Sequence, residues 1–294
     1  MNQFQLVEIT TKDKLIHQGI YFEPKTKGKR TFLWVHGLSS TFYGHIALLE
    51  AFTTASEKVG YSFAAFNNRG HDLVSGIRKL DKRKPSGYTH VNGGAGYEDF
   101  KTSTFDIEAG IEFLVTRGFS EIILVGHSTG ANKVCYFAGK KSYSALAGVV
   151  LASPLSDRLT PEFDLTHTRQ NLKHMEKLIV KGRADELQLG YHFFPLTPNR
   201  FISLVTPHSL EDQFDYGDKK PRLTHFRRVK KPLLVILGEA DEYLDRPAQE
   251  IMAVYNAFEQ SQKYTGLILP DTLHSYNGKE TEVVQSIINW AMTI

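Results

Sequence analysis

The stretch that decides the fold is Ile122-Ile-Leu-Val-Gly126-His-Ser128-Thr-Gly130-Ala-Asn-Lys-Val134. It indicates a buried strand that runs directly into Gly-x-Ser-x-Gly and then into a helix. Gly126 and Gly130 are needed because the serine occupies a tight, strained turn, where side chains two residues away would collide with neighbouring backbone. The turn lifts the Ser128 hydroxyl above the sheet, at a helix N-terminus that favours developing negative charge. Ser128 is the candidate nucleophile, and a purely structural turn is the alternative.

A nucleophilic serine needs a base, and the base needs an acid to orient it. The pattern therefore predicts a carboxylate and then a histidine, each just beyond a later strand. Asp241 follows the apolar run 233–238, and His274 follows the next apolar run. Asp241 lies three residues beyond the glycine that ends its strand, which suits its reach to the imidazole ring. We therefore expect Asp241 and His274 to complete a triad with Ser128.

Other residues compete for both roles. Glu239 and Glu242 lie close to Asp241, and Asp157 follows the preceding strand. Taken alone, His274 would be an ordinary loop histidine, like any of the twelve in the chain. The order serine, acid, histidine and the position of His274 after a strand favour the catalytic interpretation.

A tetrahedral oxyanion needs two backbone N–H donors, one after the nucleophile and one from the loop after an earlier strand. Thr129 is the first candidate, and Leu38 is the second. Gly37 would let the backbone approach the substrate closely. His36 is either a second base or a structural residue beside this loop, and the structural interpretation is favoured.

Short apolar strands alternate with longer helical segments, which indicates a mostly parallel sheet with helices on both faces. An antiparallel pair at 4–10 and 15–22 is expected at one edge of this sheet. The other expected strands are 31–35, 62–66, 121–125, 147–151, 232–237 and 265–269, which gives eight in all. The expected helices are 99–117, 131–138, 247–259 and 280–293. Right-handed crossovers would bring the carboxyl ends of the parallel strands to one rim.

The alternation breaks between residues 157 and 228, a stretch that is too long and too aromatic for a bare loop. We predict that it is a cap inserted into a core made of residues 1–156 and 229–294. A cap over the rim would exclude water and shape a substrate pocket. Its aromatic side chains could contact substrate or form the core of the cap itself. The substrate candidates are Tyr191, Phe193, Phe194 and Phe201, with Phe214 and Tyr216 as further aromatic residues of the segment.

The composition of the 294 residues, 41% hydrophobic and 23% charged, is that of a globular domain. The sequence has no apolar run of about 18 residues and does not start like a secretory signal, so we expect no membrane insertion and a cytoplasmic location. A net charge of +3 gives no case for nucleic acid. The basic group at 78–84 could bind an anion, but a solvated loop is favoured.

Motifs for other chemistries are missing from the sequence. Cys135 is the one cysteine, so a disulfide framework and a cysteine-rich metal site are excluded. The chain has no P-loop, no dinucleotide Gly-x-Gly-x-x-Gly after a strand and no His-Glu-x-x-His. We therefore expect neither a metal nor an organic cofactor.

The motifs together resemble the α/β-hydrolase superfamily over nearly the whole chain. The matching residues are His36-Gly37, Asn68-Arg69-Gly70-His71, Gly126 to Gly130, Gly238-x-x-Asp241 and His274. More narrowly, the segments 127–133, 153–158, 200–204 and 212–214 are similar to a group that includes fungal siderophore esterases. The resemblance implies an α/β-hydrolase fold and ester hydrolysis by a serine mechanism, with Ser128, Asp241 and His274 as the triad.

These observations predict a serine hydrolase that cleaves a small or medium carboxylic ester through an acyl-enzyme. Its partner would be a small-molecule substrate, and the sequence does not define an oligomeric state. Two alternatives stay open. The same triad could act on a thioester, an amide or a carbon–carbon bond. The chain could also be a ligand-binding receptor that keeps the triad with negligible turnover.

Overall fold

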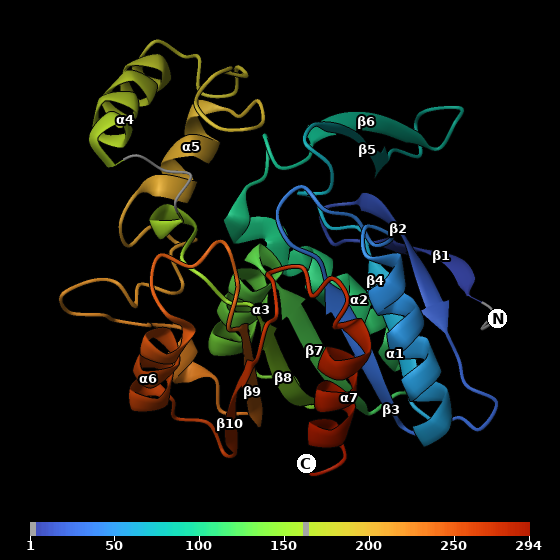
Figure 1. Cartoon of the computed structure of the whole chain (residues 1–294). Coiled ribbons are helices and arrows are strands. Elements are labelled where there is room, and N and C mark those ends of the chain that lie inside the picture. The colour runs from blue at the N-terminus through green and yellow to red at the C-terminus, as the bar shows by residue number, and fades with distance from the viewer. Residues whose placement is uncertain (1–3, 161–164) are drawn as a thin grey trace.

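The computed structural model describes residues 4–160 and 165–294. In this part of the chain, ten strands form one sheet in the order β10-β9-β8-β7-β3-β4-β2-β5-β6, with β1 paired to β2 (Figure 1). The strands are β1 Gln5–Thr10, β2 Leu15–Phe22, β3 Arg30–Val35, β4 Ser62–Phe66, β5 Ser75–Leu80, β6 Tyr88–Gly93, β7 Glu121–His127, β8 Leu146–Ala152, β9 Leu233–Gly238 and β10 Tyr264–Leu269. The six strands from β10 to β4 are parallel, whereas β2 is antiparallel to its neighbours.

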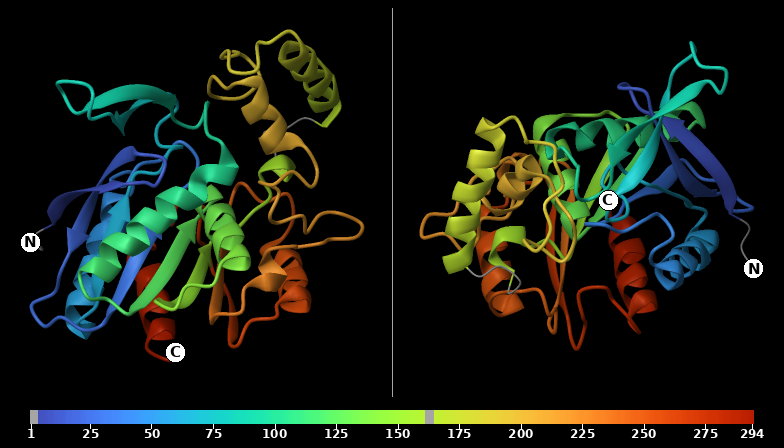
Figure 2. Two further views of the ribbon diagram at one scale, coloured as in Figure 1. Left: turned by 180° about the vertical axis from the view of Figure 1, so that it is seen from behind. Right: turned by 90° about the horizontal axis from the view of Figure 1, so that it is seen from above.

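Helices cover both faces of the sheet (Figures 1 and 2). The helices are α1 Ile46–Val59, α2 Thr104–Thr116, α3 Thr129–Lys140, α4 Leu165–Val180, α5 Pro198–Val205, α6 Ala248–Phe258 and α7 Glu280–Ala291. One core cluster lies between the sheet and α2, α3 and α6, and the other lies between the sheet and α1 and α7. The central strands are buried on both sides, which explains why their sequences are continuous apolar runs. No helix in the described ranges is long and apolar enough to cross a membrane.

All eight predicted strands form, but a polar hairpin adds two more. Strands β5 and β6 pair with each other, and β5 joins the sheet at Leu15 and Ile16 of β2. β5 lies on the same side of β2 as β4, and β1 pairs with the other side of β2 and has no further partner among the described strands, so the pair β1–β2 forms an edge of the sheet as predicted. The basic group at 78–84 begins inside β5 and is not simply a loop. Arg78 pairs with Glu8 of β1 and lies over the ring of Tyr88, so its charge faces other strands.

The four helices expected from the sequence pattern form as α2, α3, α6 and α7, and a helical piece expected at 169–181 lies in α4. Helices α1 and α5 were not predicted, and one expected helix is divided. The N-cap residue of α1, His45, makes no side-chain capping bond, so the sequence carries no capping signal for this helix. The expected helix at 99–117 is split into a 3₁₀ turn at Phe100–Ser103 and α2. The side chain of Asp99 accepts a hydrogen bond from the Lys101 N–H and so caps the turn.

The segment between β8 and β9 packs in two different environments. Helices α4 and α5 pack together over a small apolar cluster beyond the carboxyl ends of the strands (Figure 1). The buried members of this cluster are Ala95, Met175, Leu178, Phe194, Leu196, Phe201, Leu204 and Val205. In contrast, Phe214 and Tyr216 belong to the main core, where both rings contact Tyr255 of α6. The aromatic residues of this segment therefore serve two separate cores.

Candidate active site

Ser128 occupies the turn between β7 and α3 with a backbone φ of 57° and ψ of −130°, a region that L-residues seldom adopt. The turn requires glycine on both sides. A Cβ at Gly126 would lie 2.3 Å from the Gly130 carbonyl oxygen, and one at Gly130 would lie 2.2 Å from the Val35 carbonyl oxygen. The strained backbone at Ser128 is therefore held by close packing of the neighbouring backbone, as in the strand-to-helix turn that the motif predicts.

His274 and Asp241 meet through a direct hydrogen bond. The distance from His274 Nδ1 to Asp241 Oδ2 is 2.8 Å, and both side chains are buried. The other oxygen of Asp241, Oδ1, accepts the Tyr243 N–H at 3.0 Å. This second bond fixes the carboxylate, so the carboxylate can orient the imidazole ring.

The three other candidates for the orienting acid do not contact the imidazole ring of His274. Glu242 Oε2 accepts the backbone N–H of His274 at 3.0 Å, so this carboxylate holds the histidine loop and not the imidazole. The exposed Glu239 accepts a bond from Gln249. Asp157 lies in the wall of the cavity around Ser128 and is bonded to Asn132. Of the four carboxylates, Asp241 is the one bonded to the ring of His274.

Ser128 and His274 line one cavity of about 220 Å³. Its lining residues are Gly37, Leu38, Ser39, Ser40, His45, His127, Ser128, Leu155, Asp157, Thr160, His192, Phe193, Leu204, Tyr243, His274 and Ser275. Within the described residues, no hydrogen bond joins Ser128 Oγ to the imidazole of His274. Catalytic bonds of this kind often shorten only when substrate is bound.

The two expected oxyanion donors belong to segments that meet at Ser128. Thr129 is the first residue of α3, where backbone N–H groups have no partner within the helix. Leu38 lines the cavity and follows Gly37. A Cβ at Gly37 would lie 2.8 Å from Ser128 Cβ and 3.1 Å from the His127 carbonyl oxygen. The loop after β3 therefore approaches Ser128 as closely as glycine permits.

His36 makes structural contacts beneath this loop. Its Nε2 accepts the Asn68 N–H at 3.1 Å, which requires the proton to be on Nδ1, and Nδ1 lies 3.0 Å from the Gly37 carbonyl oxygen. Burial and the charge of Lys133 hold the pKa of His36 well below its usual value. Nearby, Arg69 pairs with the buried Asp106, which also contacts His17. These contacts tie down the loops at this rim and favour the structural interpretation of His36.

His127 is a supporting residue that the sequence analysis did not single out. Its Nε2 lies 2.9 Å from the His274 carbonyl oxygen, and its ring stacks on Trp34. Burial, with a further contribution from the charge of His274, holds the pKa of His127 well below its usual value. His127 therefore acts as a neutral donor that fixes the backbone of the histidine loop. It occupies the first variable position of Gly-x-Ser-x-Gly, and the motif gives no signal for this role.

The four candidate aromatic residues lie in two places. Phe193 lines the cavity and is 61% exposed. Phe194 and Phe201 are each 1% exposed and belong to the apolar cluster under α4 and α5. Tyr191 packs against that cluster and stacks on His174. Only Phe193 of these four is among the residues that line the cavity.

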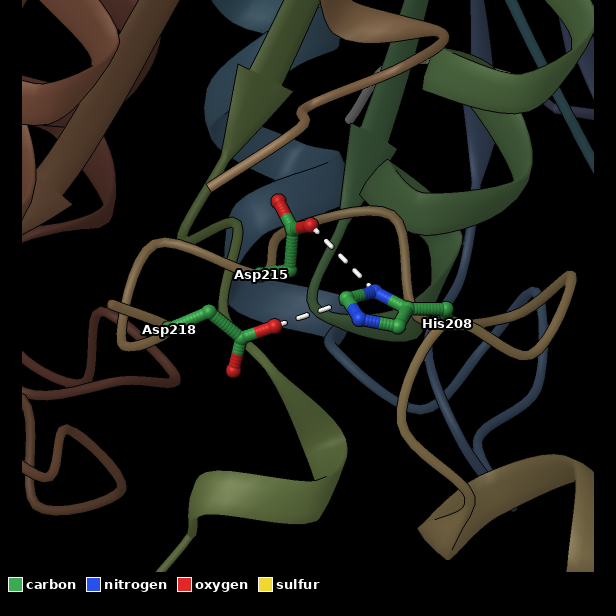
Figure 3. A group of neighbouring side chains, drawn as sticks. All are labelled: His208, Asp215 and Asp218. Carbon is green, nitrogen blue, oxygen red and sulfur yellow. Dashed lines mark ion pairs between the residues drawn. The ribbon is translucent and has the colours of Figure 1, made fainter. Parts of the chain in front are cut away.

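A second group of polar side chains, at a distance in sequence from the triad, has the residue types of a metal site. His208 Nδ1 lies 3.7 Å from carboxylate oxygens of both Asp215 and Asp218 (Figure 3). However, Asp215 accepts the backbone N–H groups of Arg222 and Leu223, and Asp218 pairs with the guanidinium of Arg158. Both carboxylates therefore already have partners in the protein, and the group is explained as an ion-pair cluster.

A family model described as "Protein of unknown function (DUF1749)" matches residues 85–293, more than half of the chain. The chain belongs to this family. The matched range contains Ser128, Asp241 and His274. A comparison of this DUF1749 protein with curated proteins gave no match.

Solved structures similar to this DUF1749 protein include hydrolases and esterases. A siderophore hydrolase from Aspergillus fumigatus has a TM-score of 0.68 at 15% identity, over 99% of this chain and 98% of that one. A carboxyl esterase from Bacillus coagulans has a TM-score of 0.64 at 16% identity, over 100% of this chain and 99% of that one. An esterase from Pyrococcus furiosus has a TM-score of 0.59 at 18% identity, over 99% of this chain and 91% of that one. The chain has the α/β-hydrolase fold, so this part of the sequence-based expectation is confirmed.

Proposed function

We propose that this protein is a serine hydrolase that cleaves a small or medium carboxylic ester, with Ser128 as nucleophile, His274 as general base and Asp241 as the orienting acid. The single observation that carries the proposal is the cavity shared by Ser128 and His274, with His274 bonded to Asp241 at 2.8 Å. The strained turn at Ser128 supports the role of nucleophile because such strain is typical of functional sites. The fold of known esterases is consistent with this chemistry.

The reaction follows from these positions in two steps. His274 takes the proton of Ser128 while Ser128 Oγ attacks the ester carbonyl carbon. The N–H groups of Leu38 and Thr129 stabilise the resulting oxyanion, and Asp241 stabilises the protonated imidazole. The intermediate collapses when His274 gives its proton to the leaving alcohol, which leaves an acyl-enzyme. A water molecule, activated by the same histidine, then attacks the acyl carbon and releases the acid.

We also propose that part of the segment between β8 and β9 serves as a cap on this site. His192, Phe193 and Leu204 come from this segment and line the cavity together with Ser128. The volume of about 220 Å³ is below the usual range for drug-sized ligands, which favours a short substrate. The apolar lining from Leu38, Phe193 and Leu204 suits an aliphatic or aromatic acyl group.

Reaction with a fluorophosphonate probe, followed by a panel of p-nitrophenyl esters, tests the proposal. We expect labelling at Ser128 and turnover of short esters, and Ser128→Ala should lower kcat by about a thousandfold or more. A Ser128→Ala protein that keeps more than about a tenth of the activity would remove Ser128 from this role. A protein that is labelled but turns over no ester, thioester or amide would instead support a binding function.

A further inference from the structure

The described residues in the wall of the cavity around Ser128 carry a single carboxyl group. Among the lining residues in the described part of the chain there is no lysine or arginine, and Asp157 is the single carboxyl group. Asp241 lies behind His274 and is not part of the lining. A substrate that occupies this cavity beside Ser128 therefore meets one acidic side chain that the proposed triad does not use.

The Asp157 side chain is fixed from behind by helix α3. Asp157 follows β8 and begins the 3₁₀ turn Asp157–Leu159. Its Oδ2 accepts a hydrogen bond from Asn132 Nδ2 at 3.0 Å. Asn132 is itself buried and donates a second bond to the Glu211 carbonyl oxygen at 3.2 Å. Within residues 4–160 and 165–294, the Asp157 carboxyl has no other hydrogen-bond partner, so Oδ1 is free for a ligand.

The ionic groups behind Asp157 leave this carboxyl without a counter-charge. Glu98 lies 2.6 Å from Lys133 Nζ and 3.5 Å from Arg200 Nη2, and Arg200 also pairs with Glu211. The side chains of Glu98, Glu211, Lys133 and Arg200 are all buried. The two positive charges of Lys133 and Arg200 balance the two negative charges of the glutamates. No cationic nitrogen of the described chain lies within 4.0 Å of the Asp157 carboxyl. Asp157 is therefore the third carboxyl in a group that already balances its charge.

Protonation relieves this imbalance. Burial raises the pKa of Asp157 well above its usual value, and the negative charges of Glu211 and Asp212 raise it further. Arg200 and Lys133 act in the opposite direction but do not offset these effects. A neutral carboxylic acid has one O–H donor. Because Oδ2 accepts the bond from Asn132, the proton is expected on Oδ1, which then points a donor at the ligand.

We propose that Asp157 is a substrate-recognition residue whose carboxylic acid donates a hydrogen bond to a neutral oxygen acceptor, such as a ketone or amide carbonyl, in the chain of the ester that Ser128 attacks. The proposal rests on the proposed function because it concerns the same cavity. It names the substrate class as esters with a second, uncharged carbonyl group. A substrate without that group would leave the acid of Asp157 unpaired in the cavity, which costs binding energy in the transition state.

A matched pair of substrates separates recognition from general reactivity. The pair is p-nitrophenyl 4-oxopentanoate and p-nitrophenyl pentanoate, which differ by one carbonyl oxygen. The readout is the ratio of their kcat/KM values. Asp157→Leu removes the donor and keeps the branching and the number of heavy atoms of the side chain, and the ratio should fall by about tenfold. Asp157→Asn keeps a donor on an uncharged group, and the ratio should stay within about twofold of the wild type.

The pH dependence of the same ratio gives a second test. As the pH rises through the pKa of Asp157, the wild-type acid loses its donor, so the ratio should fall. The ratio of Asp157→Asn should not change with pH because the amide does not titrate. The charged groups that act on the pKa of Asp157 are Glu211, Arg200, Asp212 and Lys133. The titratable side chains that line the same cavity are His45, His127, His192, Tyr243 and His274, and both sets are the same in the two proteins.

Two results would overturn the proposal. One is an Asp157→Leu protein that reacts with fluorophosphonate at the wild-type rate and keeps the wild-type ratio. The second result applies if Asp157→Leu does not fold. It is a ratio of kcat/KM values that falls with rising pH in Asp157→Asn as much as it does in the wild type. Failure of the proposed function gives a different result from failure of the Asp157 proposal. If Ser128 is not the nucleophile, Ser128→Ala will still turn over both substrates.

Discussion

The backbone of Gly37 lies so close to Ser128 that a methyl group on Gly37 would be 2.8 Å from Ser128 Cβ and 3.3 Å from Ser128 Oγ. The first distance is shorter than real Cβ contacts, so any larger residue must displace either the serine or the loop that contains Leu38. Gly37 therefore sets the distance between the proposed nucleophile and one of the proposed oxyanion donors.

We expect Gly37→Ala to lower kcat/KM for a p-nitrophenyl ester by about a hundredfold, because a displacement of about 1 Å at a catalytic group has an effect of this size. The measurement is steady-state kinetics, with circular dichroism as a check on folding. Gly76→Ala is the matched control. A Cβ at Gly76 would have its nearest contact at 3.9 Å, from His90, and so should leave kcat/KM unchanged. Equal activity in both variants would show that the contact at Gly37 is not needed for catalysis.

The carboxylates near His274 are distinguished by what they bind. Asp241→Asn should lower kcat by about four powers of ten, because the amide no longer stabilises the correct tautomer or the imidazolium. Glu242→Gln should lose less than about tenfold, since its side-chain oxygen can still accept the His274 N–H. Glu239→Gln should match the wild type. The kcat values of the three variants on one activated ester decide which carboxylate orients His274. If Glu242→Gln loses nearly all activity while Asp241→Asn stays active, the orienting acid is Glu242.

Buried neutral histidines should make the stability of the fold depend on pH. The pKa values of His36 and His127 are held well below the usual value by burial, whereas in the unfolded chain each is about 6.5. Below pH 6.5 the unfolded state therefore binds more protons than the folded state. The two neutral histidines therefore contribute fully to the free energy of unfolding above pH 6.5. As the pH falls below 6.5, each of them lowers the free energy of unfolding by about 1.4 kcal/mol per pH unit.

Urea unfolding at pH 7.5 and pH 5.5 measures this effect. We expect a lower free energy of unfolding at pH 5.5, and a smaller difference between the two pH values for His36→Asn. The exposed His90 gives the control, since His90→Asn should leave the difference unchanged. A wild-type protein equally stable at both pH values would contradict the prediction.

The sequence predicted the parts of the fold that depend on local pattern. Strands β8 and β9 and the central part of β7, residues 122–125, are continuous apolar runs because both faces are buried, and such runs can be recognised without a structure. The order of Ser128, Asp241 and His274 along the chain also follows from strand context. Hairpin β5–β6 could not be recognised in this way. Its residues are mostly polar and partly exposed, and it is held by backbone pairing between β5 and β6 and by a short pairing of β5 with β2.

Other features of the site depend on contacts between distant segments. Phe193 and Phe194 are adjacent and chemically identical, yet one lines the cavity and the other fills the apolar cluster. The carboxyl of Asp157 lacks a counter-charge only because Arg200 pairs with Glu98 and Glu211. Neither fact has a signature in the local sequence, because each depends on how the segment after β8 packs on the sheet.

The buried ion pairs of Arg200 should stabilise the packing of α5 on the core. Arg200 is 1% exposed and contacts Glu98 and Glu211, so Arg200→Met would leave two buried carboxylates short of a partner. We expect a loss of about 3–5 kcal/mol in the free energy of unfolding. Arg183→Ala is the control, because the Arg183–Glu186 pair is about half exposed and should contribute less than about 1 kcal/mol. Similar unfolding curves for both variants would contradict a special role for Arg200.

The adjacent residues Phe193 and Phe194 test whether the segment after β8 shapes the pocket. Phe193→Ala removes an exposed wall of the cavity, so the ratio of kcat/KM for p-nitrophenyl octanoate over acetate should change by about five- to tenfold, with little loss of stability. Phe194→Ala should instead lower the free energy of unfolding by about 3–5 kcal/mol, because its ring is buried in the apolar cluster. The rate of labelling by a small fluorophosphonate should stay within about twofold of the wild type for Phe193→Ala, since Ser128, Asp241 and His274 are unchanged. If the ester ratio is unchanged, or if labelling slows as much as ester turnover does, Phe193 does not select the acyl chain and the proposed cap loses its main support.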